Sequence, residues 1–268
     1  MANTRWNSAD RSANIALTGS DLIATCTSGV QGGVRAVDKQ VLNKFYWECT
    51  WNVATGGGAG VGLANSLLVL SNAPTGSTLI GLCALMRNGS VYVDGSIAAS
   101  GFGVISSGAV ICIAVDLTAR LIWFRIGGGG NWNTVASNNP ATGVGGIVLG
   151  ALGNAIPAYP TAWINTLNDQ ITANFGDTAF TGAVPSGYTS GFTAGASVPT
   201  NALASQALAE HWLTTDPDAR ITQVVAEHWT SVASGNLQAV VTFVALEHWT
   251  SVAVVVPAAG GPMVTMIH

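Results

Sequence analysis

Short runs of strand-forming residues, separated by turn residues, fill this chain from Asn14 to about Phe192. The runs are rich in β-branched and aromatic residues, Gly, Asn, Ser and Pro stand between them, and no convincing helical periodicity interrupts them. Many short strands at this spacing predict an all-β fold, an antiparallel β-sandwich. The strands expected from the pattern include Asn14–Leu17, Leu22–Cys26, Lys44–Asn52, Gly60–Ala64, Gly81–Met86, Ser90–Val93, Val110–Asp116, Leu121–Ile126, Gly146–Gly150 and Gln170–Phe175.

Two of these runs indicate where the core lies. Val110–Asp116 is almost continuously apolar, which predicts a central strand buried on both faces. Lys44–Asn52 is dense in aromatic residues, as strands that line a core tend to be.

A short phrase ending in Glu-His-Trp is repeated three times near the C-terminus, which indicates a small structural unit suited to assembly. If each copy is a strand, both of its faces are largely apolar, so neighbouring copies or other subunits must cover it. A helix remains possible for Ala202–Leu213. We therefore expect a sandwich at 1–192, a linker at 193–201 and an assembly tail at 202–268. The residues expected at the assembly interface are Glu210, His211, Trp212, Gln223, Val225, Glu227, His228, Trp229, Glu247, His248 and Trp249.

Charged residues make up only 8% of the chain, against about 25% in ordinary soluble proteins, while 49% are hydrophobic. Either the chain is an unusually apolar globular protein, or much of its surface meets other protein copies. We favour the second interpretation and expect a homo-oligomer, with a trimer as one option. The net charge of −4 and the lack of a basic run argue against a nucleic-acid partner.

Targeting and redox features are equally sparse. The polar N-terminus has no apolar signal region, and the apolar stretch Ala239–Pro257 is interrupted by Glu247 and His248 and falls short of the ~20 residues of a membrane span. Four widely spaced cysteines lack a C-x-x-C pair, so neither a zinc site nor a disulfide framework is expected, and assembly in a reducing cytoplasm follows. These cysteines are Cys26, Cys49, Cys83 and Cys112.

The catalytic repertoire is poor, because the only histidines are the three in the repeats and His268. Most sandwich carboxylates stand at turns, and the glycine runs Gly56–Gly58 and Gly127–Gly130 lack the Lys-Ser/Thr of a phosphate loop. We expect no enzyme and no cofactor. The repeat histidines could serve a metal or a pH-sensitive contact, but packing within a sheet interface is favoured.

Four segments, in order, resemble the SPRY (B30.2-like) domain, a concanavalin-like β-sandwich. They are Lys44–Thr50 with Gly60–Asn65, Gly89–Gly95, Gly108–Asp116 with Leu121–Arg125, and Thr172–Gly176. The resemblance covers residues 10–192, with two departures: Ala109 stands where the family has an acidic residue, and Gly127–Gly130 replaces an Asn-Gly turn. The family likeness implies a protein-binding module.

The tail carries a second resemblance. Its clearest copy, Ala219–Glu227, is similar to repeats of bacteriophage virion proteins that tether sandwich modules to the particle. That resemblance implies a virion structural protein in a head, neck or tail, assembled in the host cytoplasm with other virion proteins. The alternatives are a host receptor- or glycan-binding adhesin and a cytosolic SPRY adaptor.

If the sandwich binds a ligand, aromatic and amide side chains near glycine and proline turns are the best candidates, because loop aromatics offer large contact area with little entropy to lose. The candidates are Asn131, Trp132, Asn133, Tyr159 and Trp163. An equal alternative is that these rings simply cap the core.

Overall fold

The computed structural model describes residues 3–71, 74, 80–153 and 156–193, and three short strands in the C-terminal part. The chain divides into two compact units, residues 1–205 and 206–268, and each is described by itself. The linker predicted at 193–201 lies almost wholly outside the described residues.

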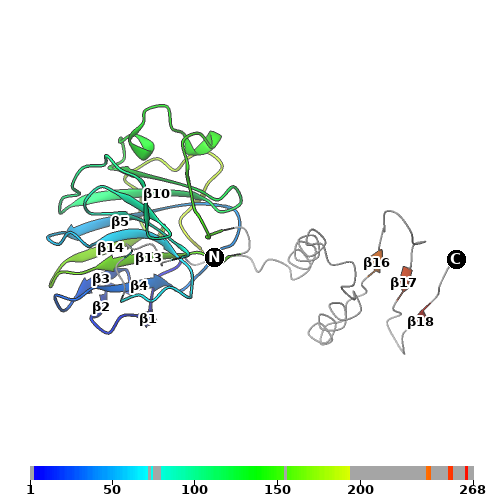
Figure 1. The fold of residues 1–268 in the computed structure, drawn as a ribbon, viewed down its shortest axis with the longest axis horizontal. Helices are drawn as coiled ribbons and strands as arrows, with labels where there is room; N and C mark the ends of the chain where they lie inside the picture. Colours follow the sequence, from blue (N-terminus) through cyan, green and yellow to red (C-terminus); the bar gives the residue numbers. More distant parts are fainter. Residues whose placement is uncertain are drawn as a thin grey trace. The chain divides into compact units, whose positions relative to one another are not determined.

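The first unit is the predicted antiparallel β-sandwich (Figure 1). Sheet I has the order β1-β4-β13-β6-β7-β8-β9. Its strands are β1 (Trp6–Arg11), β4 (Gly32–Ala36), β13 (Tyr159–Ile164), β6 (Gly60–Ala64), β7 (Leu82–Met86), β8 (Val91–Val93) and β9 (Ser96–Ala99). Sheet II has the order β12-β11-β10-β5-β14-β3-β2, and β15 pairs with β5 in parallel. Its strands are β12 (Ile147–Val148), β11 (Leu121–Ile126), β10 (Ala109–Asp116), β5 (Lys44–Val53), β14 (Gln170–Asn174), β3 (Ile23–Cys26), β2 (Ile15–Thr18) and β15 (Thr189–Ser190).

The core between the sheets confirms the two strongest strand predictions. β10 lies between β5 and β11, and its residues from Ile111 to Asp116 are all buried. In β5, Trp47 and Trp51 point into the core with Phe45 and Cys49, while Tyr46 belongs to a separate cluster on the opposite face. The alternation along β5 therefore divides its aromatics between two buried layers.

Five strands of the sandwich were not among those expected, and each has a physical reason; β15, for example, has only two residues. β1 is polar, β4 begins with Gly32 and Gly33, β9 is made of small residues, and Pro160 lies inside β13. Glycine and proline normally mark turns, and a proline within a sheet cannot donate a ladder hydrogen bond. Pro160 is nevertheless paired with Leu63 of β6, one residue after the start of β13, where its loss of a donor is best tolerated.

Both sheets also have a covered outer face. On sheet II, Tyr46, Cys112 and Trp123 are buried beneath Trp132 and Tyr188. Trp132 begins the 3₁₀ turn η1 (Trp132–Thr134), which is followed by a second 3₁₀ turn, η2 (Pro140–Thr142). Tyr188 lies in the chain just before β15. On sheet I, a second cluster is formed by Ala64, Leu68, Leu82, Ala84, Met86 and Trp163. The sandwich therefore has three apolar layers in place of one.

In the C-terminal unit the structure describes one antiparallel sheet, β16-β17-β18. Its strands are β16 (Val240–Thr242), β17 (Ala253–Val255) and β18 (Met263–Val264). β16 lies within the run Val240–Val244, for which the β-branched residues predict a strand. All eleven residues of the predicted assembly interface lie outside the described residues, as does His268. Among the described residues, no helix is long and apolar enough to cross a membrane.

Candidate functional site

A groove with a volume of about 640 Å³ opens where four separate segments of the sandwich meet. The segments are the end of β1 with the turn before β2, the loop between β3 and β4, β4 itself, and the chain that follows β6. Its lining residues are Asp10, Arg11, Ser12, Ala13, Asn14, Ser28, Val30, Gln31, Arg35, Leu68, Val69, Leu70 and Ser71. Its volume lies within the range of pockets that bind small molecules or a few residues of a peptide.

The walls of the groove are aliphatic and its rim is polar. Val30 is 65% exposed and Val69 is 57% exposed, whereas Leu68 and Leu70 are buried beneath the wall. Serine, asparagine and glutamine side chains supply the rim. An aliphatic wall edged by uncharged hydrogen-bonding groups fits a segment of polypeptide, whose backbone needs polar partners and whose side chains need apolar contact.

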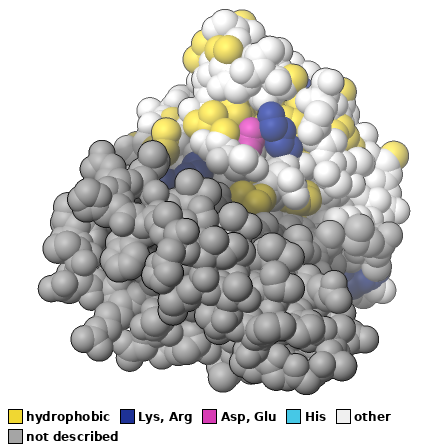
Figure 2. Space-filling model, turned by 90° about the vertical axis from the view of Figure 1, so that its right-hand side faces the viewer, with side chains coloured by type: hydrophobic (Ala, Val, Ile, Leu, Met, Phe, Trp, Pro, Cys, Tyr) yellow, Lys and Arg dark blue, Asp and Glu magenta, His cyan; other side chains and the backbone are white. Residues whose placement is uncertain are grey.

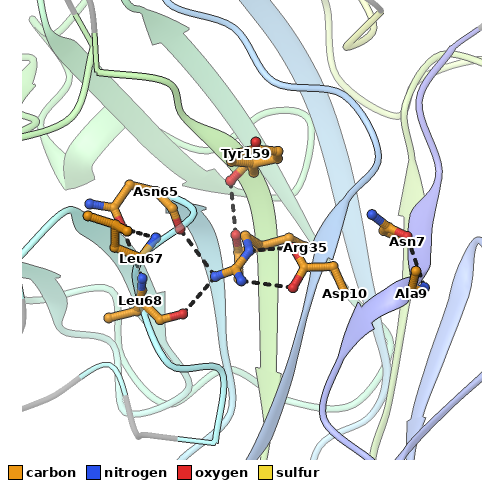
Figure 3. A network of polar contacts seen from close by, with 9 residues as sticks. Asn7, Ala9, Asp10, Arg35, Asn65, Leu67, Leu68 and Tyr159 are labelled. Carbon is orange, nitrogen blue, oxygen red and sulfur yellow. Dashed lines mark hydrogen bonds and ion pairs between the residues drawn. The ribbon is translucent and has the colours of Figure 1, made fainter.

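A partly buried ion pair holds one wall in place (Figure 3). Arg35 of β4 is bidentate to Asp10 of β1, with Nε–Oδ2 at 2.7 Å and Nη2–Oδ1 at 2.8 Å. Its Nη1 donates to the backbone carbonyls of Leu68 at 2.8 Å and Asn65 at 3.1 Å. The Asn65 side chain in turn accepts from the backbone amides of Leu67 and Leu68. Arg35 is therefore a positioning residue that fastens the chain after β6 to two strands of sheet I.

The opposite wall depends on close backbone approach. Asn14 Nδ2 donates to the carbonyl of Val30 at 2.6 Å and to Ser28 Oγ at 3.3 Å, which fixes the β3–β4 loop against the turn before β2. A Cβ at Gly32 would lie 2.5 Å from Asn14 Oδ1. Glycine at the start of β4 thus leaves the space that the Asn14 amide occupies.

Few ionisable side chains line the groove, and its one carboxylate is already paired. Its lining residues include neither histidine nor cysteine, and the Asp10 carboxylate is already held by Arg35 on both oxygens. Arg11 is exposed at one end and donates to the carbonyl of Ile15. General-base chemistry needs a carboxylate or imidazole free to take a proton, and this lining does not offer one.

The structure places Trp132 and Asn133 in structural roles. Trp132 is mostly buried and stacks under the guanidinium of Arg125, with the guanidinium carbon 4.3 Å from the ring centroid. Asn133 is buried: its amide accepts from the backbone of Phe124 at 2.9 Å and donates to Ile122 at 3.2 Å and Gly145 at 2.9 Å. The side chain thereby satisfies the amide of Phe124, which lies beyond the two β11 residues that β12 pairs, and the carbonyl of Ile122 at the end of that pairing.

The prediction that Tyr159 and Trp163 lie on a loop is wrong, because both belong to β13, and Trp163 is fully buried in the outer cluster of sheet I. Tyr159 is half-buried at the start of the strand, and Asn131 is exposed. For Trp132 and Trp163 the structure thus shows the capping alternative. The five residues do not line the groove, and ligand binding by them stays a prediction.

Buried and half-buried carboxylates of the sandwich hold backbone amides. Asp169 accepts from the amides of Thr55 and Gly56 at 2.9–3.0 Å and from the Thr55 hydroxyl at 2.6 Å, so a carboxylate of the chain itself occupies the first glycine-rich loop. Asp94 accepts from the amides of Gly81 and Ala151. Glu48 is buried and hydrogen-bonded by the segment before β15.

All four cysteines are buried free thiols. Burial raises the pKa of the Cys49, Cys83 and Cys112 thiols. A raised pKa keeps a thiol protonated at neutral pH, and a protonated, buried thiol is inert.

No family model matches the chain, and no curated protein matches it. Among solved structures, the SPRY domain of human HERC1 is similar, with a TM-score of 0.51 and 16% identity over 65% of this chain and 99% of that domain. The sandwich has a SPRY-like fold. The PSpry domain of TRIM65 (12% identity, TM-score 0.45, 65% of this chain and 90% of that one) and a human SPRY domain (16%, 0.45, 63% and 99%) also match. At these identities the likeness shows the fold alone.

Proposed function

We propose that this chain is a non-catalytic protein-interaction component of a multi-copy particle. In this proposal the SPRY-like sandwich binds a polypeptide segment of a partner protein in the groove, and the C-terminal repeats anchor the chain. The observation that carries the binding function is the groove itself, with its exposed Val30 and Val69 and its polar rim. The particle we propose is a bacteriophage virion, which the tail repeats and the scarcity of charge support.

The distribution of charge supports a surface that meets other proteins. Residues 3–193 contain eight acidic and eight basic side chains, and five of these sixteen are buried: Arg35, Glu48, Asp116, Arg125 and Asp169. Figure 2 shows one face of the molecule, on which the few visible charged side chains lie among hydrophobic and uncharged polar ones. A surface so poor in charge favours contact with protein over free solution.

A glycan-binding adhesin is less well supported than a peptide-binding module. Sugar sites use the exposed face of an aromatic ring, and the rings of Trp132 and Trp163 are occupied by packing in the sandwich. The groove lining is aliphatic and contains no aromatic residue. A cytosolic adaptor would bind its partner in the same groove. The sandwich therefore does not distinguish an adaptor from a virion protein, and the distinction rests on the tail.

Replacing Val69 by aspartate is expected to abolish peptide binding without unfolding the sandwich. Random heptapeptides are selected on the immobilised full chain, and the enriched sequences, which we expect to be aliphatic and uncharged, are titrated against the wild type and the variant. Loss of about 2 kcal/mol from a buried aliphatic contact and burial of a charge would weaken binding at least about tenfold.

Val37→Asp is the matched control, since Val37 is also an exposed valine (54%) but lies outside the groove. Enrichment of peptides that bind the wild type and Val69→Asp equally well would contradict the assignment of the groove. Enrichment of acidic peptides that depend on Arg11 would revise the peptide class but keep the site.

A further inference from the structure

Three long stretches of the sandwich, 49–86, 95–115 and 126–168, contain no charged residue, and the last two each contain an edge strand. The stretch 95–115 contains β9, the edge strand of sheet I, and the stretch 126–168 contains β12, the edge strand of sheet II. The opposite edges differ, because β1 carries Asp10 and Arg11, and Asp21 lies in the turn after β2.

The two charge-free edges adjoin each other. The backbone amide of Ala151, just after β12, donates to Asp94 Oδ2 at 3.0 Å, and Asp94 stands in the turn before β9. A Cβ at Gly101 would lie 3.9 Å from Thr134 Oγ1. Residues 95–104 and 131–148 therefore form one surface, called here the β9–β12 flank. Its exposed aliphatic side chains are Ile97, Val104, Val135, Val144 and Val148.

β9 is an open edge with little protection. In the described part of the chain it pairs only with β8, and Ser96, Ile97 and Ala98 are exposed, with Ile97 at 61%. Proteins usually guard such an edge with a lysine, a proline or an inward charge. β9 has none of these, and its protective features are its length of four residues and an irregular register opposite Val91 and Tyr92. An edge so lightly guarded offers its free backbone donors and acceptors to another strand.

We propose that the β9–β12 flank is a self-association face, on which the β9 edge of a second copy pairs antiparallel with the β9 edge of the first. A two-fold interface places the same residues of both copies opposite one another. A charged side chain near the two-fold axis would therefore lie beside the same charge of the other copy and be repelled by it. The flank carries no charge to repel, and two antiparallel edges supply matching donors and acceptors. A charged foreign partner would find no complementary charge here. This inference goes beyond the proposed function, since it needs neither the groove nor the tail.

Cysteine cross-linking tests the proposal in the full chain. Ser96, Ile97 and Ala98 are changed one at a time to cysteine, and covalent dimers are measured on a non-reducing gel after mild oxidation at low protein concentration. The four native thiols are buried, so the introduced thiol is the reactive one within the described residues. A disulfide requires Cβ atoms within about 4.5 Å, which only a specific contact provides in dilute solution. We expect at least one of the three variants to cross-link ten times faster than Val37→Cys.

A second variant separates this contact from association through the tail. Ile97→Lys places a like-charge pair in the interface and is expected to slow cross-linking at positions 96 and 98 at least tenfold, whereas Val37→Lys leaves it unchanged. Tail-driven association brings copies together without preferring position 97. The proposal would be overturned if the three β9 positions cross-link no faster than position 37, or if Ile97→Lys leaves their cross-linking unchanged. A negative result in the peptide-binding experiment on the groove would leave this proposal unaffected.

Discussion

Replacing Glu48 with alanine is expected to lower the free energy of unfolding by about 4 kcal/mol, because a buried carboxylate with three strong partners is removed. Glu48 accepts from the Tyr46 hydroxyl at 2.6 Å and from the backbone amides of Gly182 at 2.8 Å and Thr181 at 2.9 Å. Its loss leaves those two amides and the hydroxyl without an acceptor in a buried layer. Each such group costs about 1–3 kcal/mol.

The neighbours of Glu48 explain why the segment before β15 depends on it. Arg125 donates to the carbonyl of Ala183 at 3.0 Å, and a Cβ at Gly182 would lie 2.5 Å from Arg125 Nη2 and 2.7 Å from the Tyr46 hydroxyl oxygen. Burial, followed by hydrogen bonds to Cys112 and Glu48, raises the pKa of Tyr46, so its hydroxyl remains a donor. Glu48, Tyr46 and Arg125 together fasten the segment over the outer face of sheet II.

Urea unfolding of Glu48→Ala beside Asp177→Ala measures the effect. Asp177 pairs with Arg5 at 3.8 Å on the exposed surface, and such pairs contribute about 0–1 kcal/mol. A loss below about 1 kcal/mol for Glu48→Ala would show that water replaces the carboxylate and that the segment is not held as described. Glu48→Gln is expected to fall between the two, because its amide NH₂ would face the backbone donors.

Replacing Arg35 with methionine is expected to cost about 3 kcal/mol of stability and also to weaken peptide binding at least tenfold. The methionine retains an apolar stem, so the loss reports the guanidinium. Without it, the carbonyls of Asn65 and Leu68 lose their donor and Asp10 loses its partner. The chain that follows β6, with Val69 on it, would then be free to move away from the groove.

A double-mutant cycle of Arg35→Met and Asp10→Asn separates the energy of the ion pair from that of the hydrogen bonds between Arg35 and the backbone carbonyls. The Asp10 side chain is 34% exposed, so water can solvate it once Arg35 is removed, whereas Arg35 itself is only 7% exposed. We therefore expect Arg35→Met to cost more than Asp10→Asn, with a coupling energy of about 1–3 kcal/mol. Arg5→Met is the control, since Arg5 makes only exposed contacts, the pair with Asp177 and a hydrogen bond to the Ser20 carbonyl. Equal and small effects of Arg35→Met and Arg5→Met would contradict a positioning role.

Sequence patterns alone predicted most of the sandwich, because strand periodicity is a local property. β6 and β11 have the bounds that their apolar runs predict, and β5 and β10 differ from the prediction by one residue. β13 was missed because Pro157 and Pro160 read locally as turn residues, whereas the pairing of β13 with β4 and β6 is set by contacts far away in the sequence.

The groove could not be predicted in the same way, since its lining comes from segments as far apart as Asp10 and Ser71. One local signal was present: Arg35 stands within the otherwise apolar, small-residue run from Gly32 to Val37, where a buried charge demands a partner. Asn133 had no comparable signal. Its amide completes the hydrogen bonding of β11 from a residue with positive φ, a conformation that asparagine tolerates and that follows the glycine run.

The most direct test of the central claim, that a binding sandwich is carried by an assembling tail, is the mass in solution of the full chain beside a chain ending at Ser197. Light scattering over a range of concentrations gives both masses. We predict that the full chain forms higher oligomers, while the shortened chain is folded and shows at most a monomer–dimer equilibrium through the β9–β12 flank. Equal masses for the two chains, with both monomeric, would contradict the claim and leave a free-standing binding module as the function of the chain.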